Sequence, residues 1–246
     1  MHNQIDKILG DLVFYLHPEF FQEEYVKQNR PGLAFNKKLA QNYYILITAI
    51  SWFLKKISRY EVYFTDFYPS TELIKDSEAL EHHIDAYLED LETTKNKLVN
   101  YISSLKNDLK RVASNKDEIN KALTWLNTQI YIVFNNASKH RGEHRHKGFR
   151  FADKYVLDCE MAEMLLSDNF PLKDKLTTYG RERAQERRKE SFEQGKKHWS
   201  ENASKNYGQL SGLIDDVIGR TKDFLYQLLD IKTINSPDRD ASLGDS

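Results

Sequence analysis

An apolar seam between residues 84 and 112 constrains the fold of this chain more than any other feature. Its positions alternate steps of four and three residues, and all but Lys95 are apolar: Ile84, Leu88, Leu91, Lys95, Leu98, Ile102, Leu105, Leu109 and Val112. This period follows one narrow stripe along an α-helix, which is typical of helices that pack lengthwise. The seam therefore predicts a helix over residues 83–113 within a coiled coil or a long bundle.

Three further stretches also predict helices. Asn115 and Glu118 resemble a capping box, and the same rhythm follows them at Ile119, Leu123, Leu126, Ile130, Val133 and Ala137. Residues 33–66 predict one long helix, which the segment 64–71 ends and whose apolar middle at 43–54 places it centrally. Residues 173–232 are helical in pattern, with a charged first half and an amphipathic second half.

The stretch from 147 to 170 leaves two readings open. A short β-hairpin near 148–158 fits its aromatic and apolar residues, and so does a loop followed by a short helix at 159–166. Ten glycines and five prolines are few for 246 residues, which favours helices over turn-rich β structure. We therefore expect an all-α fold, an elongated bundle of long antiparallel helices. Its parts would be an N-terminal helical segment at 1–32, the bundle at 33–234 and a disordered tail at 235–246.

Composition excludes several classes of protein. Lys plus Arg is 36 and Asp plus Glu is 37, so the net charge of −1 excludes a generally basic nucleic-acid coat protein. Cys159 is the only cysteine, which excludes an intramolecular disulfide and predicts a cytoplasmic protein. The most apolar run, residues 43–54, is too short to span a membrane, so we expect no membrane association. Gly-rich phosphate loops, G-x-S-x-G and HExxH motifs are absent from the sequence.

The segment KHRGEHRHKGFR, residues 139–150, concentrates titratable cations. Arg141 lies seven residues after Phe134 and therefore has nearly the same azimuth, which places the cluster on the inward side of a helix end. Arg141 and His146 are five residues apart, and five residues rotate by about 500° on a helix, which leaves about 140° between them. They converge only if the helix breaks, and Gly142 is a natural stop.

Histidine and arginine in this arrangement suit metal-independent RNA cleavage. A histidine can remove the 2′-hydroxyl proton or protonate the leaving 5′-oxygen, and an arginine can bind the scissile phosphate. His140 or His144 would supply the second proton-transfer group. The alternative is that cations at a helix C-terminus only offset the helix dipole.

Two other groups of residues could form binding sites. A metal site built on His140, His144 and His146 has no well-placed fourth ligand and lies among four Lys and Arg neighbours, so we expect no metal and no cofactor. The charged run at 181–197 is either a solvated helix face or a phosphate-contacting surface.

The helix NTQIYIVFNNASKHRGEHRH resembles the HEPN superfamily (higher eukaryotes and prokaryotes nucleotide-binding domain), through an Arg-x4-His motif that follows an Asn and a Lys-His. The resemblance covers roughly residues 35–232. It implies that Arg141 binds phosphate, that His146 is the acid/base with His140 beside it, and that two chains form a homodimer. The residue after the arginine is usually polar in that superfamily and is Gly142 here.

From these features we expect an RNA-binding protein, a candidate metal-independent endoribonuclease of the toxin or antiphage-defence type. The candidate RNA contacts are Lys139, His144, Arg145, Lys147 and Arg150. The expected partners are RNA, a second copy of the chain, and a cognate antitoxin or regulatory protein. The alternative is a non-catalytic helical module for interaction or dimerisation.

Overall fold

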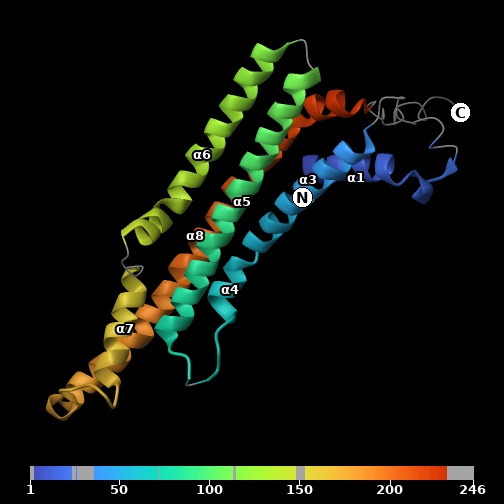
Figure 1. Ribbon diagram of the computed structural model, residues 1–246. Coiled ribbons are helices and arrows are strands. Elements are labelled where there is room, and N and C mark those ends of the chain that lie inside the picture. Colours follow the sequence, from blue (N-terminus) through green and yellow to red (C-terminus); the bar gives the residue numbers. More distant parts are fainter. Residues whose placement is uncertain are drawn as a thin grey trace, which may run out of the picture. The chain divides into compact units, whose positions relative to one another are not determined.

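The computed structural model describes residues 3–23, 26, 36–71, 73–112, 115–147 and 153–231, with their side chains except at 3 and 136–147. These residues form an all-α fold, and no strand occurs among them. The helices are α1 (Asn3–Leu16), α3 (Lys37–Ile57), α4 (Tyr60–Asp66), α5 (Asp76–Val112), α6 (Lys116–Lys147), α7 (Lys154–Leu166) and α8 (Thr178–Leu229), with 3₁₀ turns η1 (Pro18–Phe20) and η2 (Lys173–Lys175) (Figure 1).

The chain forms two compact units. Unit 1 takes the described residues within 1–49, 100–126 and 214–246, and unit 2 takes those within 50–99 and 127–213. The expected boundary between residues 32 and 33 and the expected tail at 235–246 both lie outside the described residues. Helix α1, which belongs to the N-terminal segment, is part of unit 1.

Unit 1 has a core of isoleucine, leucine and tyrosine, and hydrogen bonds to carboxylates connect its helices. The backbone N–H of Gln4, at the start of α1, donates to Asp215 Oδ1 at 3.1 Å, and the Tyr226 hydroxyl donates to Asp11. These two pairs show that α1 runs parallel to the end of α8. The Tyr43 hydroxyl donates to Asp108 Oδ2 at 2.8 Å and so connects α3 to α5. Fully buried core residues of unit 1 include Ile5, Ile8, Leu12, Tyr43, Ile47, Leu105 and Leu225.

Unit 2 surrounds one buried carboxylate. Asp90 of α5 is 5% exposed, and it accepts hydrogen bonds from the Tyr60 hydroxyl and from Lys56 Nζ, the latter at 2.9 Å. A buried charge is costly unless it is paired and hydrogen-bonded, and both conditions hold here. Aromatic rings of Phe64, Tyr87 and Trp199 pack beside this site with centroids 5.8 to 6.2 Å apart.

Helix directions in unit 2 are mixed. Asp76 of α5 contacts Arg188 of α8, and Tyr87, further along α5, contacts Asn206, further along α8. These two helices are therefore parallel. Helix α7 is antiparallel to α8, because Asp153 bonds Trp199 while Asp158 bonds Arg187 (Figure 1). The expectation of antiparallel neighbours therefore does not extend to α5 and α8.

The predicted seam is confirmed along nearly all of α5. Eight of its nine positions face the interior or are partly covered, whereas Val112 at the helix end is 65% exposed. The ammonium of Lys95 pairs with Glu92 at 2.7 Å and lies 5.8 Å from the Tyr131 ring centre, which accounts for a polar residue in the seam.

One predicted helix is interrupted, and of the two readings left open for 147–170 the one with a short helix at 159–166 agrees with α7. The helix expected over 33–66 is interrupted between α3 and α4. In this turn the Arg59 N–H donates a hydrogen bond to the Lys56 carbonyl, and the Ser58 hydroxyl donates one to the Lys55 carbonyl. The hairpin near 148–158 does not form over 154–158, which belong to α7. Asp153 caps that helix by accepting from the N–H groups of Tyr155 and Val156 at 2.9 and 3.1 Å.

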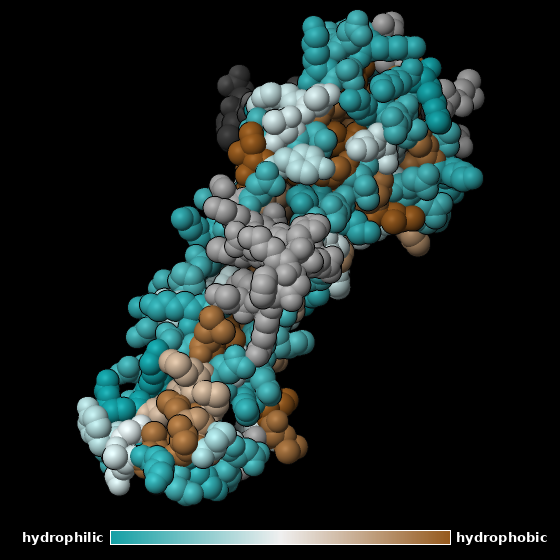
Figure 2. Space-filling view, turned by 60° about the vertical axis from the view of Figure 1, so that its left-hand side comes forward, coloured by the Kyte–Doolittle hydropathy of each residue, from teal (hydrophilic) through white to brown (hydrophobic). Residues whose placement is uncertain are grey.

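The face of the molecule in Figure 2 is mostly hydrophilic, with separate brown patches of apolar side chains. Among the helices of the described residues, none has a stretch both long and apolar enough to cross a bilayer.

Candidate functional site

The cationic segment that suggested RNA cleavage lies at the end of α6. This helix continues to Lys147, so the break expected at Gly142 does not occur and the backbone is helical across it. Lys139, His140, Arg141, His144, Arg145, His146 and Lys147 all belong to α6, but their side chains lie outside the described residues, and Arg150 lies outside altogether. On an unbroken helix, positions 141 and 146 are about 140° apart.

The buried stripe of α6 is in register with position 141. Ile119, Leu123, Leu126, Ile130 and Phe134 are all buried, whereas the expected seam member Val133 is partly exposed. The stripe therefore shifts by one residue at Phe134, and seven residues further along the same row lies Arg141.

The cations of the charged run on α8 differ in how closely they pair with carboxylates. Arg183 pairs with Glu186 at 2.6 Å, and Arg187 pairs with Asp158 of α7 at 2.7 Å. Lys196 pairs with Glu193 at 3.2 Å. Arg188 is held more loosely, since its Nε lies 3.5 Å from Asp76 Oδ2, beyond the usual range of about 2.7–2.9 Å for a charge-assisted hydrogen bond.

Two adjoining cavities open beside Arg188 in unit 2. The first has a volume of about 660 Å³ and is lined by one face of α8, including Arg181, Gln185, Arg188 and Lys189. The second, of about 490 Å³, is lined by the loop before α5, including Ser70, Thr71 and Lys75, and by the end of α7. Asp76, Leu166 and Arg188 line both cavities, so the two share a wall.

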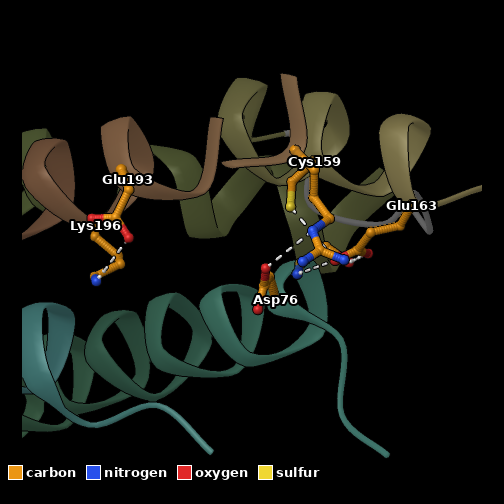
Figure 3. Close-up of polar contacts among 7 residues, drawn as sticks. Asp76, Cys159, Glu163, Glu193 and Lys196 are labelled. Atoms are coloured by element: carbon orange, nitrogen blue, oxygen red, sulfur yellow. Dashed lines mark hydrogen bonds and ion pairs between the residues drawn. The ribbon is translucent and has the colours of Figure 1, made fainter. Parts of the chain in front are cut away.

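The linings of these cavities together carry a small excess of positive charge. Four cations line them, namely Lys75, Arg181, Arg188 and Lys189, against the three acids Asp76, Glu163 and Glu193. Glu193 is paired with Lys196, and Glu163 accepts from the N–H and the hydroxyl of Ser77 (Figure 3). Glu193 therefore has a cationic partner outside the lining, whereas Asp76 and Glu163 keep their negative charge beside the lining cations.

Glu163 and Cys159 form a buried structural contact beneath the second cavity (Figure 3). Glu163 is 8% exposed, and by bonding Ser77 it satisfies a free N–H at the start of α5. The Cys159 thiol donates to Glu163 Oε1 at 3.6 Å. Burial and the neighbouring carboxylate raise the pKa of Cys159, so the thiol stays protonated and is no nucleophile.

The histidines near α5 do not form a metal site. In the part of the chain whose side chains are described, no three His, Cys, Asp or Glu residues are placed to hold a metal ion. His83 Nε2 instead lies 2.5 Å from the Phe67 carbonyl, where it donates as the neutral ring. Burial lowers the pKa of His83.

Sequence reasoning found the cations of α8 but missed their neighbours. The loop residues Ser70, Thr71 and Lys75 and the helix-starting Asp76 carry no motif, and only the parallel packing of α5 on α8 brings them to Arg188.

The comparisons do not place the chain among known proteins. No family model matches the sequence, and neither a curated protein nor a solved structure shows significant similarity to it.

Proposed function

We propose that the protein binds RNA through the cationic end of α6 and is a candidate metal-independent endoribonuclease. The observation that carries the proposal is the uninterrupted helix from 139 to 147. It holds four Lys or Arg residues against a single Glu, a net charge of +3 with neutral histidines, along about 12 Å of helix axis.

Binding is tested by fluorescence anisotropy with a labelled single-stranded RNA across a range of salt concentrations. Neutralising three contacting cations, in Arg141→Ala/Arg145→Ala/Lys147→Ala, should make the log–log salt slope shallower by about 2, because each phosphate contact contributes about 0.7. The matched control removes three exposed cations at the turn between α5 and α6: Lys110→Ala/Arg111→Ala/Lys116→Ala. Equal salt slopes for the two triple variants would show that these α6 cations do not contact RNA.

Cleavage requires more than binding. On a continuous helix, Arg141 and His146 lie too far apart in azimuth to reach one phosphate, so we propose that a second copy of the chain completes the site, as the HEPN resemblance implies. The wild-type protein should then cleave structured RNA in EDTA, and His146→Ala should retain binding but lose cleavage. If wild type and His146→Ala give identical products, the ribonuclease part of the proposal fails and RNA binding stands alone.

The second candidate is a non-catalytic interaction module, and one surface favours it. Leu157, Met161 and Met164 of α7 follow helical spacing and are 44%, 38% and 52% exposed, which gives one apolar row on the surface. A second copy of this chain is the proposed occupant, and its assembly would not depend on the α6 cations. Light scattering on wild type and Met161→Glu measures this: a dimer converted to monomer supports the module, and an unchanged mass excludes the α7 row.

A further inference from the structure

We infer that the two cavities around Arg188 bind a short segment of single-stranded RNA, with one bridging phosphate at Arg188 and a nucleoside on either side. This inference rests on the proposed RNA binding and assigns it a site separate from the end of α6. It uses residues of α5, α7 and α8 and the loop residues Ser70, Thr71, Ile74 and Lys75, all within unit 2.

The position of Arg188 is the first argument. Its side chain lines both cavities, so a group bound at the shared wall contacts it from either side. The guanidinium of Arg188 has five N–H donors, and its 3.5 Å contact with Asp76 is a weak interaction of one of its nitrogens. A phosphate can engage two of those donors at once, which a single carboxylate oxygen at that distance does not.

The charge excess is the second argument. Glu193 pairs with Lys196 outside the lining, so four cations remain against the carboxylates of Asp76 and Glu163, an excess of two. Lys189 and Arg181 extend the positive surface along α8, and Lys75 extends it on the other side. Cations in both cavities, with Arg188 shared between them, suit a chain of phosphates better than one isolated anion.

Volume and lining chemistry are the third argument. Cavities of about 660 and 490 Å³ lie in the range of small-molecule sites, about 300–1,000 Å³, and exceed what a bare phosphate needs. Phe192 and Leu166 offer apolar surface to a base in the first cavity, and Ile74 and Leu166 do so in the second. The Ser70, Thr71 and Ser167 hydroxyls of the second cavity are donors and acceptors of the kind that recognise a ribose 2′-hydroxyl.

The experiment measures anisotropy with a labelled RNA of about 12 nucleotides, within the usual site size for single strands. Arg188→Ala should weaken binding about tenfold and Lys189→Ala about threefold. Asp76→Asn should tighten binding about twofold, because it removes the acid that opposes the phosphate. The matched control is Arg183→Ala, on the same helix, which lines neither cavity and should change affinity less than about twofold.

A second arm locates the bound RNA. Photocrosslinking of 4-thiouridine RNA to the full-length protein, followed by peptide mapping, should give adducts in residues 181–193 and 66–76. Adducts confined to 139–150, with Arg188→Ala and Lys189→Ala both at wild-type affinity, would overturn the two-cavity site and leave the α6 proposal intact. A wild-type protein that binds no RNA would overturn both. Thermal melting of each variant excludes misfolding, and Lys189, exposed on α8, provides the test if Arg188→Ala fails to fold.

Discussion

Gly195 is the position where the packing of α8 is most sensitive to one added methyl group. A Cβ at this position would lie 2.6 Å from Leu80 Cδ2 and 2.9 Å from Tyr155 Cβ. Leu80 is fully buried, and Tyr155 Cβ is attached directly to the α7 backbone, so neither neighbour yields easily. Gly195→Ala therefore forces α8 away from both α5 and α7.

The expected magnitude follows from two opposing effects. Overpacking costs about 1–3 kcal/mol, and alanine gains up to about 1 kcal/mol over glycine within a helix. We expect Gly195→Ala to lower the free energy of unfolding by about 1–2 kcal/mol. Gly208 and Gly212, in the same helix, have nothing within 4 Å of an added Cβ, so alanine at either should raise that free energy by about 0.5–1 kcal/mol.

Urea denaturation followed by circular dichroism measures these differences directly. Gly195→Ala should unfold at a lower urea midpoint than wild type, and Gly208→Ala at a higher one, with similar m-values. In thermal melts the two should differ by about 3–12 °C, at about 2–4 °C per kcal/mol for a chain of this size. If Gly195→Ala is as stable as Gly208→Ala, the close approach of α8 to α5 and α7 is refuted.

Three further predictions concern buried titratable groups. Burial lowers the pKa of His83, so the folded state resists its protonation; stability should fall as the pH drops below about 6.5, and thermal melts of His83→Gln should show a smaller fall. Among the described residues, burial raises the pKa of Tyr43, Tyr60, Tyr68, Tyr87, Tyr101 and Tyr226. Absorbance at alkaline pH should show these six ionising well above the ordinary tyrosine pKa of about 10 or upon unfolding, and stability should fall as the pH rises past about 10. Glu163→Ala leaves the Ser77 N–H without its acceptor and should cost about 1–3 kcal/mol in urea denaturation, whereas Glu163→Gln should cost less because its amide oxygen still accepts.

Periodicity predicted the all-α fold because each long helix repeats its apolar stripe many times. The seam from Ile84 to Leu109 was found for this reason, and its one polar member, Lys95, is accommodated by Glu92 and the ring of Tyr131. A break needs only one or two residues, so it leaves little periodic signal. The turn at Ser58 and Arg59 was missed for that reason, and Gly142, predicted to break a helix, lies within one.

The neighbours of a helix are harder to predict than the helix itself. The direction of α8 relative to α5 depends on how the chain returns through α7, and no residue pattern in either helix encodes it. The sequence therefore yielded the cations at 181–189 but not the loop and the Asp76 that share their cavities. A site assembled by tertiary packing has no spacing that a motif can record.

The small residues of α8 connect its packing to the proposed RNA site. Ala184, Ser191 and Gly195 are buried on one row, where short side chains allow α8 to lie close to its neighbours. Arg188, seven residues before Gly195, has nearly the same azimuth, and the close approach of α8 to α5 brings it to Asp76 on the first turn of α5. Displacing α8 by a methyl group at Gly195 should therefore widen the Arg188–Asp76 separation as well as destabilise the fold.

At temperatures where Gly195→Ala remains folded, its RNA affinity should differ from wild type, whereas that of Gly208→Ala should not. Unchanged affinity in a folded, destabilised Gly195→Ala would show that the cavities do not depend on this contact.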